Sequence, residues 1–233
     1  MDLRFYDQVV THLNVERLDA YRQDDVDHTT TLARYLLNIA LCDSLYAPLQ
    51  MVEVTLRNAL HESLSIKANT DTWYDSLTLP QWQAKQISDS QLKLMRQGKS
   101  LSPGRVVAEQ TFGFWIGFFT KPHMTSGLAY HLAKTAFPLA PKAERDMAKL
   151  TPKWQKVRDL RNRVFHHERI IHWQDLEDQH RSMTQLIGWM NPELEQLTQM
   201  LDRFTEVRSQ GLTPWREKLI SNWPTHTEGG NHE

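Results

Sequence analysis

Residues able to bind a phosphate and to move a proton are concentrated between Val157 and His172, in the segment VRDLRNRVFHHERIIH. Four arginines and three histidines occur there: Arg158, Arg161, Arg163, Arg169, His166, His167 and His172. Arginine binds phosphate oxygens through planar paired donors, and histidine exchanges a proton near neutral pH. Together these groups suit the cleavage of a phosphodiester, in which one group stabilises charge and the other transfers protons.

Arg161, Asn162 and His166 have the spacing that this chemistry needs. On a helix, Asn162 and His166 share a face because they are four residues apart. Arg161 is offset from His166 by about 140°, so a helix that ends near His166 is needed to turn the histidine towards the arginine. That arrangement would bring a guanidinium, an amide and an imidazole into one space. It suits metal-free cleavage of RNA, in which the 2′-hydroxyl attacks the neighbouring phosphate.

The segment is locally basic, although the chain is not. From Lys153 to Arg169 there are six basic and two acidic residues, whereas the whole chain has a net charge of −1. Any binding of nucleic acid must therefore use a local patch. A helix C-terminus also favours cations and histidines through its dipole. On residue types and spacing alone, a structural role for the segment stays as open as a catalytic one.

Three stretches of the chain carry a resemblance to a known family. The Arg161-Asn162-x-x-x-His166 pattern resembles the Arg-polar-x-x-x-His motif of HEPN-domain proteins. With EVTLRNALHESL (53–64) and TFGFWIGFF (111–119) before it, the sequence resembles the Abi-like (abortive infection) branch of that superfamily. One position departs from the Abi-like pattern, because Arg169 stands where proline is expected after HHE.

The resemblance implies an all-helical bundle of HEPN type and a metal-independent endoribonuclease that acts in phage defence or as a toxin. It makes Arg161 and His166 catalytic, with Asn162 orienting them, and it implies an active site assembled across a homodimer. RNA is the expected substrate and a cognate antitoxin a further partner. No cofactor is expected. Four neighbouring residues are predicted to bind the substrate: Arg158, Arg163, His167 and Arg169.

Two other interpretations of the same segment remain. A metal site is disfavoured because His167 and His172 are five residues apart, whereas one helical face needs four; Glu168 is expected to pair with an arginine instead. The competing function is a non-catalytic helical module, in which the basic segment binds RNA, a nucleotide or a protein partner.

The rest of the sequence predicts a helical scaffold. Apolar residues recur at three- and four-residue steps without persuasive strand alternation, which predicts one all-α domain over residues 1–222 and a disordered tail over 223–233. Pro48 predicts a kink or a break, with a second helix from Leu49 to Lys67. The apolar run TFGFWIGFFT (111–120) is predicted to be a buried helix rather than a strand. Thr151 and Pro152 predict the start of the helix that carries the basic segment to about Phe165.

The scaffold also contains residues that could be mistaken for functional ones. Arg57-Asn58-x-x-His61 echoes the main motif, but an intrahelical Glu53–Arg57 pair is the preferred interpretation. Three tryptophans able to stack on bases are expected to pack in the core instead: Trp73, Trp115 and Trp189.

The sequence also bears on the cellular compartment. The single cysteine, Cys42, excludes a disulfide within the chain and is expected to be a buried, inert thiol. Neither a secretory signal nor a membrane-spanning segment is recognised, so no membrane partner is expected and the predicted compartment is the cytoplasm.

Overall fold

A computed structural model describes residues 3–22, 27–124 and 127–224. Within these ranges every regular element is a helix and none is a strand, which confirms the predicted all-α class. Most of the predicted tail, residues 225–233, lies outside the described residues. The chain forms two compact units, and the single domain expected over 1–222 stays a prediction.

The first unit comprises Met1–Leu45, Arg163–Gln174 and Arg203–Glu233. Its helices are α1 (Leu3–Leu13), α2 (Val15–Asp19), the beginning of α3 (His28–Ala68), α13 (Phe204–Gln210) and α14 (Thr213–Asn222). Two ion pairs join its C-terminal segment to its N-terminal one, Arg203–Asp43 at 2.7 Å and Arg216–Asp27 at 3.6 Å. The unit is therefore built from segments that are far apart in the sequence.

The second unit comprises Tyr46–Asn162 and Asp175–Asp202. Its elements are the rest of α3, α4 (Trp73–Ser76), α5 (Gln81–Arg96), α6 (Pro103–Ala108), α7 (Phe112–Ile116), the 3-10 helix η1 (Gly117–Phe119), α8 (Lys121–Met124), α9 (Leu128–Thr135), the 3-10 helix η2 (Lys142–Glu144), most of α10 (Met147–Phe165), α11 (Leu176–Met190) and α12 (Pro192–Leu201). Helix α5 packs against α6, and α11 packs against α12.

The aromatic run TFGFWIGFFT lies in the core of the second unit. It forms α7 and η1, and Phe114, Trp115 and Phe118 are fully buried, so the predicted buried helix is confirmed. A Cβ atom at Gly117 would lie 2.3 Å from the Trp82 ring, so any other residue there would force this tryptophan to move. The core also contains Trp73 and Trp189. The prediction that Trp73, Trp115 and Trp189 are packing residues is therefore confirmed.

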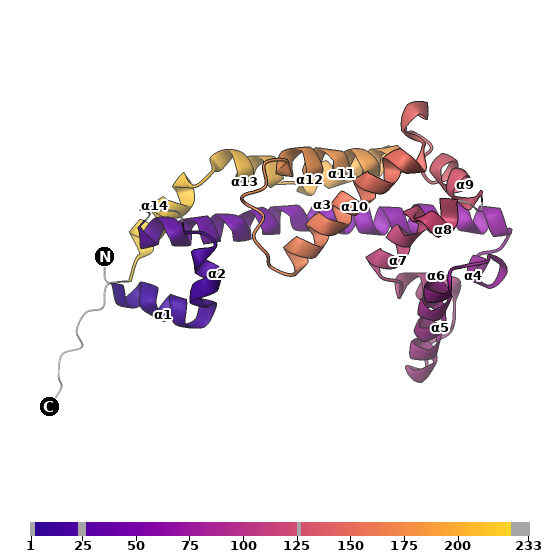
Figure 1. Cartoon of the computed structure of the whole chain (residues 1–233), viewed down its shortest axis with the longest axis horizontal. Helices are drawn as coiled ribbons and strands as arrows, with labels where there is room; N and C mark the ends of the chain where they lie inside the picture. The colour runs from indigo at the N-terminus through magenta and orange to yellow at the C-terminus, as the bar shows by residue number, and fades with distance from the viewer. Residues whose placement is uncertain (1–2, 23–26, 125–126, 225–233) are drawn as a thin grey trace. The chain divides into compact units, whose positions relative to one another are not determined.

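Helix α3 continues through Pro48, so the predicted possibility of a break is wrong (Figure 1). A proline inside a helix costs about 3 kcal/mol because it lacks an N–H and crowds the preceding turn. The neighbouring Leu45, Leu49 and Val52 are almost completely buried. Burial of this apolar stripe offsets the local cost of the proline.

Helix α10 begins at Met147, earlier than predicted, and contains Pro152 in its interior. The Asp146 carboxylate accepts a hydrogen bond from the Ala148 N–H at 3.0 Å, at the start of this helix. Thr151, the predicted cap, instead donates its hydroxyl to the Phe119 carbonyl at 2.9 Å. The prediction was wrong because the threonine hydroxyl bonds a distant segment rather than the end of its own helix.

Candidate functional site

The basic segment passes from the end of α10 into a loop. Arg161 and Asn162 lie near the end of the helix, which finishes at Phe165 as predicted. The Arg161 and Asn162 side chains are partly exposed, and His166 is exposed at the first position after the helix. Arg161 and Asn162 belong to the second unit and His166 to the first. The catalytic action of the three residues together stays a prediction.

Arg161 is paired with a carboxylate of α3. Its Nε lies 3.4 Å from Glu53 Oε2, and both side chains are 30% exposed. The predicted Glu53–Arg57 pair is wrong: Arg57 Nε donates to Asn58 Oδ1 at 3.2 Å, and Glu53 contacts α10 instead. Because an ion pair restrains both partners, Glu53 limits the orientations that the Arg161 guanidinium can take.

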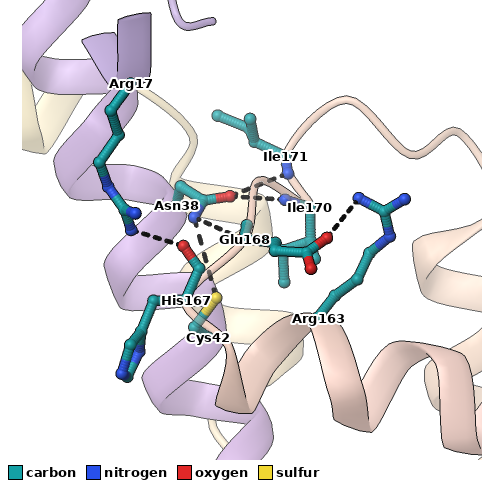
Figure 2. Close-up of polar contacts among 8 residues, drawn as sticks. All are labelled: Arg17, Asn38, Cys42, Arg163, His167, Glu168, Ile170 and Ile171. Atoms are coloured by element: carbon teal, nitrogen blue, oxygen red, sulfur yellow. Dashed lines mark hydrogen bonds and ion pairs between the residues drawn. The ribbon is translucent and has the colours of Figure 1, made fainter. Parts of the chain in front are cut away.

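Asn38 binds the loop that follows α10 (Figure 2). Its side chain is buried, and its Oδ1 accepts hydrogen bonds from the N–H groups of Ile170 at 2.8 Å and Ile171 at 3.1 Å. Its Nδ2 donates to the Glu168 carbonyl at 3.3 Å. One amide thereby replaces the secondary structure that this loop lacks. Sequence reasoning missed Asn38. The signal that could have found it is its spacing from Leu41 and Leu45, which places this polar side chain on the apolar, core-facing side of the helix.

Two arginines tie the same loop to the N-terminal segment. Arg17 Nη2 donates to the His167 carbonyl at 2.6 Å, as Figure 2 shows, and the Arg169 guanidinium donates to the Ala20 carbonyl. His167 has φ 57°, in the left-handed region that non-glycine residues adopt rarely. The Arg17 bond is made to this strained residue and contributes to fixing its backbone.

The predicted substrate-binding residues have different surroundings. Arg158 pairs with its neighbour Asp159 at 3.2 Å. Arg163 pairs with Glu168 at 3.0 Å, which confirms that this glutamate pairs with an arginine, and also lies over the Trp173 ring at 5.1 Å. Arg163 and Arg169 thus make contacts that shape the loop. Their role, and that of Arg158, in binding a substrate stays a prediction.

His167 lines a pocket of about 530 Å³ within the first unit. Three of the described lining residues are basic, His12, Arg17 and His167, and none is a carboxylate. The other lining residues are Leu13, Tyr35, Asn38, Ile39 and Cys42. Cys42 is half-buried, and burial raises the pKa of its thiol to about 11. The thiol is therefore neutral near pH 7, but the cysteine is less buried than predicted because it lines this pocket.

The second motif-like cluster has a structural role. Trp73 is fully buried, and its indole N–H donates to His61 Nδ1 at 2.9 Å. His61 must be unprotonated at Nδ1 to accept this bond. Burial lowers the pKa of His61 below its ordinary value of 6.5, although Asp71 opposes the shift. His61 is therefore held neutral as a packing residue.

This bond predicts a loss of stability in mild acid. The folded-state pKa of His61 lies below that of the unfolded chain, so its contribution is present above pH 6.5 and is lost as the pH falls through the folded-state pKa. In urea unfolding between pH 7 and 5, His61→Gln, which keeps an acceptor but does not titrate, should show a shallower decline of the unfolding free energy. The difference should not exceed about 1.4 kcal/mol per pH unit. Identical slopes for the two proteins would contradict this role.

Across the described ranges, His, Cys, Asp and Glu side chains nowhere gather in a group of three or more able to ligate a metal. None of the described helices is long and apolar enough to cross a membrane. Comparisons of the chain with protein-family models, with curated proteins and with solved structures find no match.

Proposed function

We propose that this protein is a metal-independent endoribonuclease of HEPN type, which acts in phage defence or as a toxin. The observation that carries the proposal is the Arg161-Asn162-x-x-x-His166 spacing at the end of α10, where the helix stops and His166 becomes exposed. The proposal includes a homodimer as the active form, RNA as substrate, a cognate antitoxin as a further partner and a cytoplasmic location.

The proposed reaction is an internal transfer at phosphorus. The His166 imidazole accepts the proton of the ribose 2′-hydroxyl, and O2′ forms a bond to the adjacent phosphorus. The bond from phosphorus to O5′ breaks, and a second imidazole, from the other copy of the motif in the dimer, gives O5′ its proton. Arg161 stabilises the charge on the phosphorane oxygens. The products are a 2′,3′-cyclic phosphate and a 5′-hydroxyl.

The 2′-hydroxyl supplies the decisive test. Purified protein should cleave an RNA oligonucleotide in the presence of a chelator and leave a 2′,3′-cyclic phosphate end, measured by mass spectrometry. The matched substrate carries one 2′-deoxynucleotide at the cleaved position and should be resistant there, because it lacks the nucleophile. Cleavage that requires a divalent cation, or equal cleavage of the two substrates, would refute the proposal.

The runner-up is a non-catalytic module that binds RNA, a nucleotide or a protein partner. The observation that favours it is that Arg163 pairs with Glu168 and Arg169 donates to the Ala20 carbonyl. These structural contacts leave fewer cations to stabilise the phosphate during cleavage. Binding of the RNA oligonucleotide by wild type and His166→Ala alike, with no cleavage by either protein, would select this function.

A further inference from the structure

The pocket beside His167 has a chemistry that the proposed cleavage does not use. His12 comes from α1, Arg17 from α2 and His167 from the loop after α10, and all three line the same space. The described lining includes no aspartate or glutamate. Three basic groups without a carboxylate favour an anionic ligand, and arginine with histidine is typical of phosphate binding.

Contacts hold Arg17 and the loop that carries His167, two of the three basic parts of the pocket. Arg17 is held by the His167 carbonyl at 2.6 Å and by the face of the Tyr35 ring, 5.8 Å from its guanidinium carbon. A guanidinium has five N–H donors, which is more than the number of hydrogen bonds that a single carbonyl oxygen can accept. Asn38, buried among the lining residues, fixes the loop that carries His167. A ligand would therefore meet a site whose backbone is already ordered.

The remaining lining is apolar or neutral. Leu13, Tyr35 and Ile39 present hydrocarbon or ring surface, and Ile39 is 47% exposed although it is a large apolar residue. Exposed apolar surface beside convergent polar groups is characteristic of small-molecule sites, whose volumes are about 300–1,000 Å³. The 530 Å³ pocket lies in this range and accommodates a phosphate with a ring system attached.

We propose that this pocket binds a nucleoside monophosphate, with its phosphate on His12, Arg17 and His167 and its base against Tyr35 and Ile39. The same chemistry is offered by a free nucleotide and by the phosphorylated end of an RNA strand. The site does not depend on the proposed ribonuclease activity, because His166 is not among the residues that line it.

Calorimetry with AMP, adenosine and inorganic phosphate tests the proposal. AMP should bind, and adenosine and phosphate should each bind at least about tenfold more weakly, since each lacks half of the recognised groups. Displacement of AMP by a 5′-phosphorylated oligonucleotide, but not by its 5′-hydroxyl counterpart, identifies a strand end as the source. If neither oligonucleotide displaces AMP, the ligand of this site is the free nucleotide. Absence of AMP binding overturns the proposal.

His12→Ala is the decisive variant because His12 is exposed and, among the described residues, its side chain has a single 3.4 Å contact, with the Gln8 carbonyl on its own helix. It should lower AMP affinity about tenfold, the cost of one hydrogen bond to a charged group. His172→Ala, at an exposed position outside the lining, is the matched control and should bind as wild type. Equal affinities of His12→Ala and wild type would overturn the assignment. His166→Ala should retain AMP binding, which separates this site from cleavage.

Cys42 supplies an independent readout because it is the only cysteine of the chain and lines the pocket. Modification of its thiol by a maleimide should be slowed at least about fivefold by saturating AMP, and the labelled mass identifies the site without ambiguity. In the His12→Ala variant the same AMP concentration should protect Cys42 from the maleimide less than it does in wild type. Labelling that AMP leaves unchanged would place the nucleotide elsewhere and contradict the proposal.

Discussion

His166→Ala should lower the rate of RNA cleavage about 10²- to 10⁴-fold, the range that a positioned general acid or base contributes. In the proposed mechanism the His166 imidazole accepts the 2′-hydroxyl proton, and alanine has no group that could do so. The single-turnover rate on a fixed oligonucleotide in chelator gives the measurement. His172→Ala, another exposed histidine of the same loop, is the control and should keep the wild-type rate.

The same variant separates catalysis from folding. His166 is exposed, so its truncation should change the unfolding free energy by less than about 0.5 kcal/mol. Arg161→Ala should also abolish cleavage, but it leaves the Glu53 carboxylate without its 3.4 Å partner and so also perturbs the fold. A loss of cleavage in His166→Ala with unchanged stability therefore carries the assignment. If both variants cleaved RNA at the wild-type rate, the assignment of His166 and Arg161 as catalytic residues would be wrong.

Local patterns explain why much of the fold could be predicted. Helical spacing of apolar residues and the absence of strand alternation indicated an all-α chain, which the described residues show. The end of α10 at Phe165 also agrees with the position predicted from the sequence. The helix start was mispredicted because Thr151 bonds Phe119, a contact that no local rule contains.

The contacts that shape the site were beyond local patterns. Glu53 pairs with Arg161, 108 residues away, rather than with Arg57 on the next turn. Arg17 bonds the carbonyl of His167, 150 residues away. Both pairs depend on which helices pack together, and side-chain spacing in one helix carries no information about that. The pocket was missed for the same reason, since its basic groups come from three separate segments.

Asn38→Ala should lower the unfolding free energy by about 3 kcal/mol, because it leaves two backbone donors without their acceptor. The Ile170 N–H is buried, and the Ile171 N–H is partly so. Urea unfolding monitored by circular dichroism gives the value. Asn58→Ala is the matched control, an exposed asparagine on the same helix, and should change stability by less than about 0.5 kcal/mol.

Asn38→Asp distinguishes the acceptor from the donor of the same amide. Aspartate keeps an oxygen that can accept from Ile170 and Ile171 but lacks the Nδ2 donor to the Glu168 carbonyl. It also buries a charge, so the Asn38→Asp protein should be less stable than wild type. Both Asn38 variants should weaken AMP binding and slow RNA cleavage, because the loop that presents His166 and His167 loses its internal anchor. If either variant matched Asn58→Ala in stability, the loop would have to be held by its arginine contacts alone, and the buried amide would not be what fixes the site.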